Sequence, residues 1–232
     1  MRYSFTWNGV SSRDMGIYLR EMPEIVRPEE RIQHVTIPGR AGELTQTEGA
    51  DVYNSYIQTI PIAVYTEAAV RAAEAWLRGA GSVSFGGQPD LKQNARVINA
   101  VTFQKHSRGS VYWDAQVQFY CEPLKSKVTT EADIELTESG TVNNPGDVTA
   151  FPRIVIDGSG DITISAGGKS ISLTGIQTGT VVDCETGWVI YNNAALAGVY
   201  TGNFPELPAG DSMVSFTGNV TKLTITPRWR YL

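Results

Sequence analysis

The stretch SVYWDAQVQFYCE, residues 110–122, alternates apolar and polar side chains over its whole length. A period of two is typical of a β-strand that has one face in the core and the other toward water. The alternation therefore predicts a strand and a β-rich core around it. The side chains on its core face would be Val111, Trp113, Ala115, Val117, Phe119 and Cys121.

Shorter stretches before this strand also indicate β-structure. Apolar and polar residues alternate over residues 3–7, and Asn8-Gly9 after them suits a tight turn because both tolerate positive φ. Further strands are expected near residues 16–20, 33–37 and 56–65. Pro61 lies inside the last of these, and since proline cannot donate a backbone hydrogen bond, it indicates an edge strand or a bulge.

A single helix is expected over residues 67–78. Thr66 can cap its first turn, and Gly79 and Gly81 follow its end. The apolar residues within it recur at helical spacing and form one stripe, which favours packing on a sheet over binding a partner. These residues are Val70, Ala73, Trp76 and Leu77.

The second half of the chain predicts many short strands separated by glycine-rich turns, a pattern that fits a sandwich or jelly roll. The expected strands are 153–156, 161–165, 169–173, 181–184, 188–191, 213–216 and 220–226. Large apolar residues are few in 123–144, so we expect a linker there. The sequence thus predicts a mainly β protein, with an N-terminal β-sandwich-like domain (1–122) carrying one packed helix and a C-terminal β-sandwich (145–232).

Charge argues against nucleic-acid binding. The chain has 19 basic and 24 acidic residues, a net charge of −5, and no basic stripe. Without such a stripe there is no surface for gripping phosphates. No stretch approaches the roughly 18 apolar residues of a membrane span, and the first residues do not have the pattern of a signal peptide, so we expect no membrane insertion.

Residues that carry chemistry are sparse. Cys121 and Cys184 are too few and too far apart for a disulfide scaffold or a zinc site. His34 and His106 are the two histidines, and no Gly-x-Ser-x-Gly motif is present, so both histidines are expected to be structural or exposed. We therefore expect no enzyme activity, no metal and no cofactor. The stretch 157–161, DGSGD, resembles part of a calcium loop, but strand-to-strand turn chemistry explains it better.

Three aromatic residues of the second half are candidate contacts for carbohydrate or for a partner protein. Trp188, Tyr191 and Tyr200 could stack on sugar rings if exposed on a sandwich face. The alternative is that Trp188 packs in the core of its own sheet, and the general enrichment of aromatics in strands favours this alternative.

The segment Gly39-Arg40-Ala41-Gly42 has two opposite interpretations. It matches the GXXG loop that clamps a nucleic-acid backbone, but that loop joins two helices in basic surroundings. Here it follows an expected strand and precedes the polar, acidic run GELTQTEGAD. The context favours a bend between strands that holds Arg40 outward.

A series of short motifs, taken in order along the chain, resembles the pattern of the distal tail protein family of long-tailed, non-contractile bacteriophages. The resemblance covers nearly the full chain and rests on number, order and spacing. Two turn positions depart from the family pattern, Ala41 and Asp211. The residues that carry it are Phe5, Asn8-Gly9, Ser12, Asp14-Met15-Gly16-Ile17, Ile37 to Gly42, Trp76-Leu77, Phe85, Asn144-Pro145-Gly146, Phe151-Pro152, Ile154-Val155-Ile156, Gly158-Ser159-Gly160, Pro208-Ala209-Gly210 and Pro227-Arg228-Trp229-Arg230.

The resemblance implies a structural virion protein, made in the host cytoplasm and located at the distal tail tip. It implies a ring, usually a homohexamer, that joins the tail tube to the adsorption apparatus and lets DNA pass. The N-terminal domain would build the ring, and a galectin-like C-terminal sandwich would hold receptor-binding proteins or other baseplate parts. Further expected partners are the tail tube protein and a tail-tip or tail-associated protein.

We hypothesise that residues 39–52 reach a neighbouring subunit, with Arg40, Glu43 and Glu48 in polar contacts there. An acidic to neutral chain suits a ring that must not grip DNA, and exposed sheet edges become useful where neighbours cover them. Two other function classes stay open at this point. One is a carbohydrate-binding module recognising host cell-surface polysaccharide, and the other is a wall hydrolase, for which no paired carboxylates stand out.

Overall fold

The computed structural model describes residues 3–105 and 109–232, and the chain divides into two compact units. Unit 1 runs to Thr129 and includes Leu232, and unit 2 is Thr130–Tyr231. Strands dominate both units, and α1 (Glu67–Trp76) is the helix of the described residues. The predicted mainly β class with one helix is confirmed.

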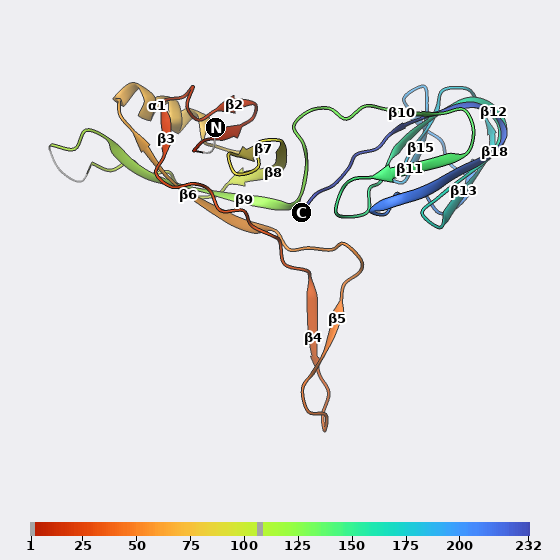
Figure 1. Ribbon diagram of the computed structural model, residues 1–232, viewed down its shortest axis with the longest axis horizontal. Helices are drawn as coiled ribbons and strands as arrows, with labels where there is room; N and C mark the ends of the chain where they lie inside the picture. Colours follow the sequence, from red (N-terminus) through yellow and green to blue (C-terminus); the bar gives the residue numbers. More distant parts are fainter. Residues whose placement is uncertain (1–2, 106–108) are drawn as a thin grey trace. The chain divides into compact units, whose positions relative to one another are not determined.

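Unit 1 is built on a curled antiparallel sheet in which seven strands are described (Figure 1). Its two longest members, the antiparallel neighbours β6 and β9, pair without a break from Tyr56 to Val64. The strands in sheet order are β2 (Val10–Ser11), β1 (Phe5–Trp7), β7 (Ala80–Phe85), β8 (Leu91–Val97), β9 (Trp113–Lys127), β6 (Tyr56–Val64) and β3 (Ile17–Leu19).

Helix α1 covers one face of this sheet. The Thr66 hydroxyl accepts a hydrogen bond from the Ala69 amide at 3.2 Å, which is the expected N-cap. Ala73 and Leu77 are buried, and the Trp76 ring stacks on Phe5 at 5.6 Å between centroids. The predicted helix and its packing on the sheet are therefore confirmed.

Pro61 lies where one side of β6 becomes a strand edge, so the expected edge position is confirmed, and no bulge is present in its described pairing with β9. Its strand is paired with β9 on one side, and on the other the Pro61 carbonyl accepts from the Arg20 amide at 3.1 Å. Strand β3 ends at Leu19, just before this position. A proline is tolerated here because β3 ends before this position, so no neighbouring strand requires the backbone N–H that proline lacks.

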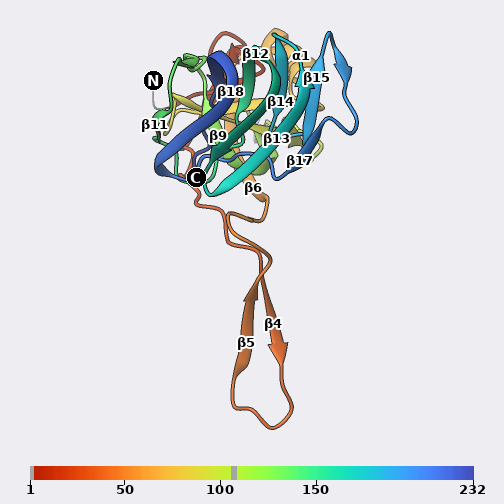
Figure 2. The same ribbon diagram turned by 90° about the vertical axis from the view of Figure 1, so that its right-hand side faces the viewer.

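Unit 2 is a two-layered β-structure whose two longest strands contribute to both layers (Figure 2). The first part of β12 (Arg153–Ala166) pairs with β14 (Thr180–Asp183), and its last part pairs with β13 (Lys169–Ile176). Strand β18 (Gly210–Thr226) runs beside β12 over residues 215–226, with register shifts at the bends. The remaining strands are β10 (Ile134–Leu136), β11 (Gly140–Asn144), β15 (Trp188–Tyr191), β16 (Ala194–Ala195) and β17 (Tyr200–Gly202).

Two pairs of expected short strands are single long strands, because glycines that suggested turns form bends inside them. Strand β12 continues through Gly158 and Gly160, and its register with β18 shifts at these positions. A Cβ on Gly158 would lie 2.4 Å from the Asn219 carbonyl oxygen, and one on Gly218 would lie 2.4 Å from that of Asp161. Glycine is needed there for close backbone approach, so the turn predicted at 157–161 was wrong.

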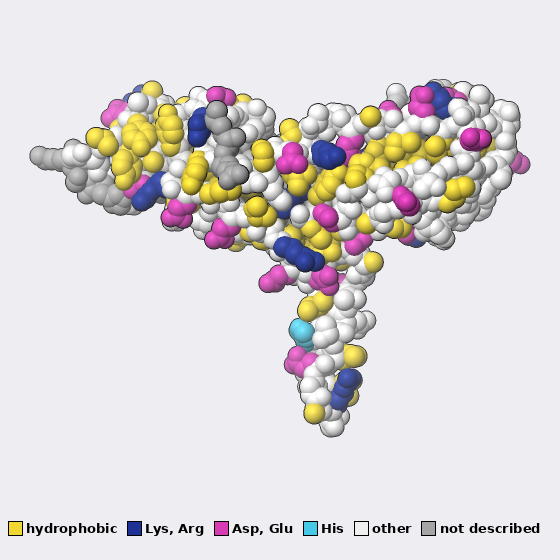
Figure 3. All heavy atoms as spheres, viewed as in Figure 1, with side chains coloured by type: hydrophobic (Ala, Val, Ile, Leu, Met, Phe, Trp, Pro, Cys, Tyr) yellow, Lys and Arg dark blue, Asp and Glu magenta, His cyan; other side chains and the backbone are white. Residues whose placement is uncertain are grey.

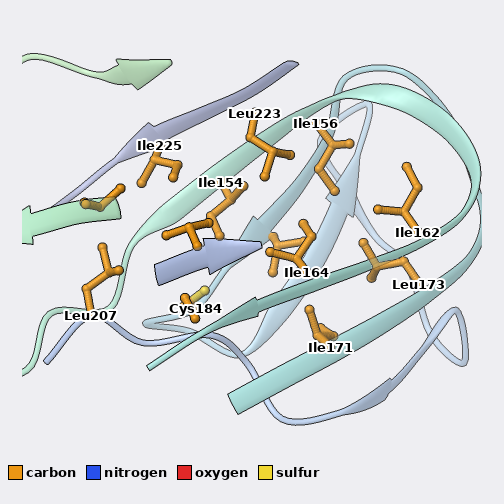
Figure 4. Close-up of a cluster of buried hydrophobic side chains, with 14 of the residues drawn as sticks. Ile154, Ile156, Ile162, Ile164, Ile171, Leu173, Cys184, Leu207, Leu223 and Ile225 are labelled. Atoms are coloured by element: carbon orange, nitrogen blue, oxygen red, sulfur yellow. The ribbon is translucent and has the colours of Figure 1, made fainter. Parts of the chain in front are cut away.

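The core of unit 2 lies between the layers (Figure 4). Isoleucines of β12 point toward those of β13 and toward the second half of β18, and all of these side chains are buried. The main contributors are Ile154, Ile156, Ile162, Ile164, Ile171, Leu173, Leu223 and Ile225.

The segment expected as a linker, 123–144, contains strand structure. Strand β9 extends to Lys127, and β10 and β11 both pair with β18. These two strands are short and carry few large apolar residues because they occupy the margins of unit 2.

A charged clamp fixes the C-terminal segment within unit 2. The Arg228 guanidinium donates two hydrogen bonds to the buried Asp183 carboxylate, at 2.8 and 2.9 Å. Arg228 and Arg230 each donate to Glu185 as well. The Glu131 carboxylate accepts from the Trp229 amide. This bidentate network ties the end of the chain to the β14–β15 turn.

Candidate functional site

The most exposed regular element is the hairpin formed by β4 (Ile32–Thr36) and β5 (Glu43–Thr47). Every residue from 31 to 50 is exposed, although the two strands pair in register from Ile32↔Thr47 to Thr36↔Glu43. Within unit 1 the hairpin extends away from the sheet (Figure 1), and its side chains lie in the open (Figure 3). We call residues 31–50 the arm. An isolated two-stranded hairpin is marginally stable in water, so the arm receives little stabilisation from its own chain and is a candidate contact surface.

The two faces of the arm differ in chemistry. One face carries Val35 and Leu44 as a cross-strand pair, with Ile37 beyond them toward the tip. The other face carries Ile32 near the base but is otherwise polar, with the His34 ring 3.4 Å from the Thr45 hydroxyl and 3.7 Å from the Glu43 carboxylate. The apolar face near the tip is therefore the side suited to burial against a partner.

The tip of the arm contains the Gly39-Arg40-Ala41-Gly42 segment. Gly39 and Gly42 both have positive φ, which reverses the chain between β4 and β5, and the Arg40 amide donates to the Ile37 carbonyl at 3.1 Å. The interpretation as a bend that holds Arg40 outward is confirmed. In the described part of the chain, the Arg40 side chain forms no ion pair.

The other two expected contact residues of the arm have partners within it. Glu43 accepts from the Thr36 hydroxyl at 3.4 Å, and Glu48 accepts from the Gln33 amide at 2.8 Å. Glu48 also lies 3.8 Å from the Arg31 guanidinium. The structure therefore places all three residues on the exposed arm, with Arg40 the one that has no partner among the described residues.

A groove lies beside β6, at the base of the arm. The chain pairs with β6 through β3, and after Arg20 it separates from β6. Residues 21–26 on one side and 57–61 on the other enclose a hollow of about 260 Å³. Its lining combines the exposed carboxylates Glu21 and Glu24 with apolar side chains, Met22 and Ile57 among them.

The wall of the groove formed by β6 is an open strand edge. Because backbone groups alternate along a strand and the Pro61 carbonyl faces β3, those of Thr59 and Ile57 face the groove. Neither residue makes a backbone hydrogen bond to residues 21–26 in the described structure. Gln58, with 4% of its surface exposed, lines the same groove, and no side-chain hydrogen bond of Gln58 occurs among the described residues.

A second, more polar hollow of about 410 Å³ lies across β9. An ion pair between Arg20 and Asp114, 2.9 Å apart, forms part of its lining. The Asn99 side chain is fixed there by hydrogen bonds to the Gln116 carbonyl and from the Gln118 amide, both 2.8 Å long. Since these groups satisfy one another, the hollow provides no obvious binding group.

The three aromatic candidates of unit 2 do not form one surface. Trp188 is 54% exposed, because the next residue of β15, Val189, takes the core-facing position. The expectation that Trp188 packs in the core was therefore wrong. Tyr191 is half-buried at the end of the same strand, whereas Tyr200 lies on β17 and packs against Phe204 and the core.

The two cysteines are buried and Tyr56 is partly buried, and burial changes their acidity. Burial raises the pKa of the Cys121 and Cys184 thiols to about 12, so both stay protonated and unreactive at neutral pH. Burial likewise raises the pKa of Tyr56 to about 12. His34 is exposed on the arm, and His106 lies outside the described residues. No cluster of three or more potential metal ligands occurs within 3–105 and 109–232.

No helix in the described residues has the length and apolar character needed to span a membrane. No protein-family model matches the chain, and no curated protein matches it in sequence. Solved structures do match. Two structures of the phage p2 baseplate in its activated conformation, with Ca and with Sr, align at 7% identity with TM-scores of 0.47 and 0.44, too low to carry an argument.

A much stronger match is the crystal structure of the SPP1 Dit (gp 19.1) protein, described as a paradigm of the hub adsorption apparatus in phages that infect Gram-positive bacteria. The alignment covers 99% of both chains at 18% identity, with a TM-score of 0.73. The expected resemblance to distal tail proteins is thus confirmed at the level of the fold: this chain has the fold of the SPP1 Dit hub protein across both of its units.

Proposed function

We propose that this protein is a structural hub of a phage tail tip, a distal tail protein that assembles into a closed ring. The observation that carries the proposal is the match in fold to SPP1 Dit over 99% of both chains. That match includes both units, so it concerns the whole arrangement of domains along the chain and not one common sandwich fold.

In this proposal unit 1 builds the ring, which is a homohexamer by the resemblance, and the arm reaches a neighbouring subunit through Arg40, Glu43 and Glu48. The arm supports this role because its two strands, 32–36 and 43–47, keep regular pairing although every residue from 31 to 50 is exposed. Twelve basic and 13 acidic residues in 1–122 leave the ring-forming part nearly neutral, which suits the passage of DNA without binding to it.

Unit 2 is proposed to be a galectin-like sandwich that holds receptor-binding proteins or other baseplate parts, while the ring contacts the tail tube and a tail-associated protein. The protein would then reside in the virion at the distal tail tip. Catalysis has no part in this proposed role. The supporting feature of unit 2 is its extensive buried core, which holds the strands so that their exposed side chains can serve as a contact surface.

The proposal is tested by the particle mass of the purified full chain, measured by light scattering, together with negative-stain images. Closed rings are expected, alone or after addition of the tail tube protein. The double variant Arg40→Ala/Glu43→Ala should lower the ring fraction, whereas Arg71→Ala/Glu74→Ala, a matched charge change on the exposed face of α1, should not. Monomers under all of these conditions would contradict the proposal.

A second candidate function is carbohydrate binding by unit 2, favoured by the exposed Trp188 ring. An exposed indole can stack on a sugar ring. Titration of the full chain with host cell-wall polysaccharide, compared with Trp188→Ala, tests this directly. Equal heats for the two proteins would exclude Trp188 as a sugar contact.

A further inference from the structure

The groove beside β6 has the features of a docking site for another segment of polypeptide. Ile57 and Thr59 present backbone donors and acceptors along an open edge, and the nearly buried Gln58 amide lines the same groove without a partner among the described residues. Main-chain pairing to such an edge is a common mode of peptide recognition. A volume of about 260 Å³ holds a few side chains and falls below the roughly 300–1,000 Å³ of typical small-molecule pockets.

The rim of the groove is acidic, and its carboxylates have no cation. Glu21 and Glu24 are both exposed and form no ion pair with any described residue. The complementary charge on the same chain is at the tip of the arm, where Arg40 is likewise exposed and without a carboxylate. Opposite unpaired charges on two surfaces favour their association.

The apolar parts of the two surfaces also correspond. The tip carries Val35, Ile37 and Leu44 on one face, each exposed. The groove offers the exposed Met22 and Ile57 together with Val26. Contact between these surfaces removes apolar area from water on both sides.

The arm cannot reach the groove of its own chain. Seven residues separate Ile32 from Gly39, so at the usual rise of a strand the tip lies about 23 Å from the base of the arm. The groove is at that base, formed by residues just before and just after the arm. The occupant must therefore come from another molecule.

We infer that the arm tip of one copy, residues 37–44, occupies the groove between Glu21–Val26 and β6 of a second copy, with Arg40 facing Glu21 and Glu24. The contact is heterologous, because the arm tip of one copy meets the groove at the arm base of the next. Repeating this contact gives a closed ring when the rotation between neighbouring copies divides a full turn evenly. The inference rests on the proposed ring and adds the receiving site, which the arm alone does not identify.

Disulfide trapping tests the contact on the full chain. Cysteines replacing Arg40 and Glu24 should cross-link different copies under mild oxidation, giving dimers and a ladder up to the ring on a non-reducing gel. A disulfide needs Cα atoms within roughly 7 Å, and the native cysteines are buried, so they do not interfere. The matched control pairs Arg40→Cys with Glu74→Cys on the exposed face of α1 and should give no ladder.

Charge reversal supplies a second measurement. Arg40→Glu should weaken assembly at least roughly tenfold, as should Glu21→Arg/Glu24→Arg, and the triple variant should regain assembly because the charges match again. Particles of ring mass that show no ladder above the control, or whose Glu24→Cys thiol reacts freely with a maleimide, would overturn the inference and leave the ring proposal intact. Absence of particles and of ladder together would overturn both.

Discussion

Two antiparallel hairpins of this chain show how differently the same motif can be stabilised. The β12–β13 hairpin turns through Gly167-Gly168 and buries one face, including Ile164 and Ile171, in the core of unit 2. The β4–β5 hairpin has five regular cross-strand pairs and no buried residue. The first is stabilised by burial in its own unit, whereas the second has no such burial in the described structure. The two hairpins have a similar number of cross-strand pairs, six and five, so burial and not pairing is what distinguishes them.

The largest expected effect is on the buried hairpin. Ile171→Ala removes buried methyl groups from a fully enclosed site and should lower the free energy of unfolding of unit 2 by about 2–5 kcal/mol. Hydrogen exchange of unit 2 peptides with increasing denaturant measures this. Ile171→Val is the matched control, expected to lose about 0.5–1.5 kcal/mol. Equal stability of Ile171→Ala and the wild type would contradict the assignment of this hairpin to the core.

The clamp on the C-terminal segment predicts a smaller, pH-dependent effect. Hydrogen bonds from Arg228, opposed by partial burial, hold the pKa of the Asp183 carboxyl below its usual value of 3.8. A lowered pKa means that the pair stabilises unit 2 fully above that usual value, and that the stabilisation is lost as pH falls through the lowered one. Asp183→Asn should cost about 2 kcal/mol at pH 7, because Arg228 loses its charged acceptor.

The test of the clamp compares melting temperatures between pH 7 and pH 2. The wild type should lose more stability than Asp183→Asn as pH falls below about 4, because the amide does not titrate. Parallel curves for the two proteins over that range would show that Asp183 does not contribute through its charge.

A third prediction concerns α1, which lies between the two extremes because it combines a local cap with a buried face. Thr66→Ala removes the side-chain acceptor of the Ala69 amide and should cost about 1 kcal/mol. Thr66→Ser keeps that acceptor and is the control. Thermal unfolding of unit 1, followed by circular dichroism, detects the difference, and identical melting of the two variants would argue against the cap.

The smallest effect on monomer stability is expected in the arm. Leu44→Ala deletes an exposed side chain and should change the free energy of unfolding by less than about 0.5 kcal/mol. Its effect should appear instead in assembly, as a lower ring fraction by light scattering at the same protein concentration. A loss of several kcal/mol in the monomer would mean that the arm is packed against its own chain, which would remove the contrast between the two hairpins.

An element can be predicted from the sequence when its apolar residues recur at a regular spacing that marks the face toward the core. Strand β9 and helix α1 were predictable because one side of each is apolar at regular spacing. Strand β5, ELTQT, and strand β8, LKQNARV, were missed since polar residues fill most of their positions. Their pairing depends on neighbouring strands, which a local pattern does not record.

Glycine was the main source of error in the second half of the chain. Gly158 and Gly160 suggested a turn, but the structure uses them where β12 bends beside β18. A turn and a bend inside a strand require the same residue, so the choice is made by the long-range pairing. The prediction that Trp188 packs in the core was wrong for a related reason. The sequence indicated the strand β15, but it did not indicate which face of that strand meets the core.

For the candidate site, the sequence located the arm tip and Arg40 but not the groove. Gly39 and Gly42 marked the bend, and the charge of Arg40 was readable directly. The groove forms because the chain separates from β6 after Arg20, and this depends on the path of residues 21–26 through space. The lining residues of the groove carry no shared motif, so only coordinates bring them together.

The sharing of β12 and β18 between both layers has a mechanical consequence. These strands pair over ten positions, on both sides of the bends, so neither layer can peel away while the other stays intact. Force applied along the strands would load those pairs in shear instead of opening them one at a time. Unit 2 should therefore resist tension along these strands as one block.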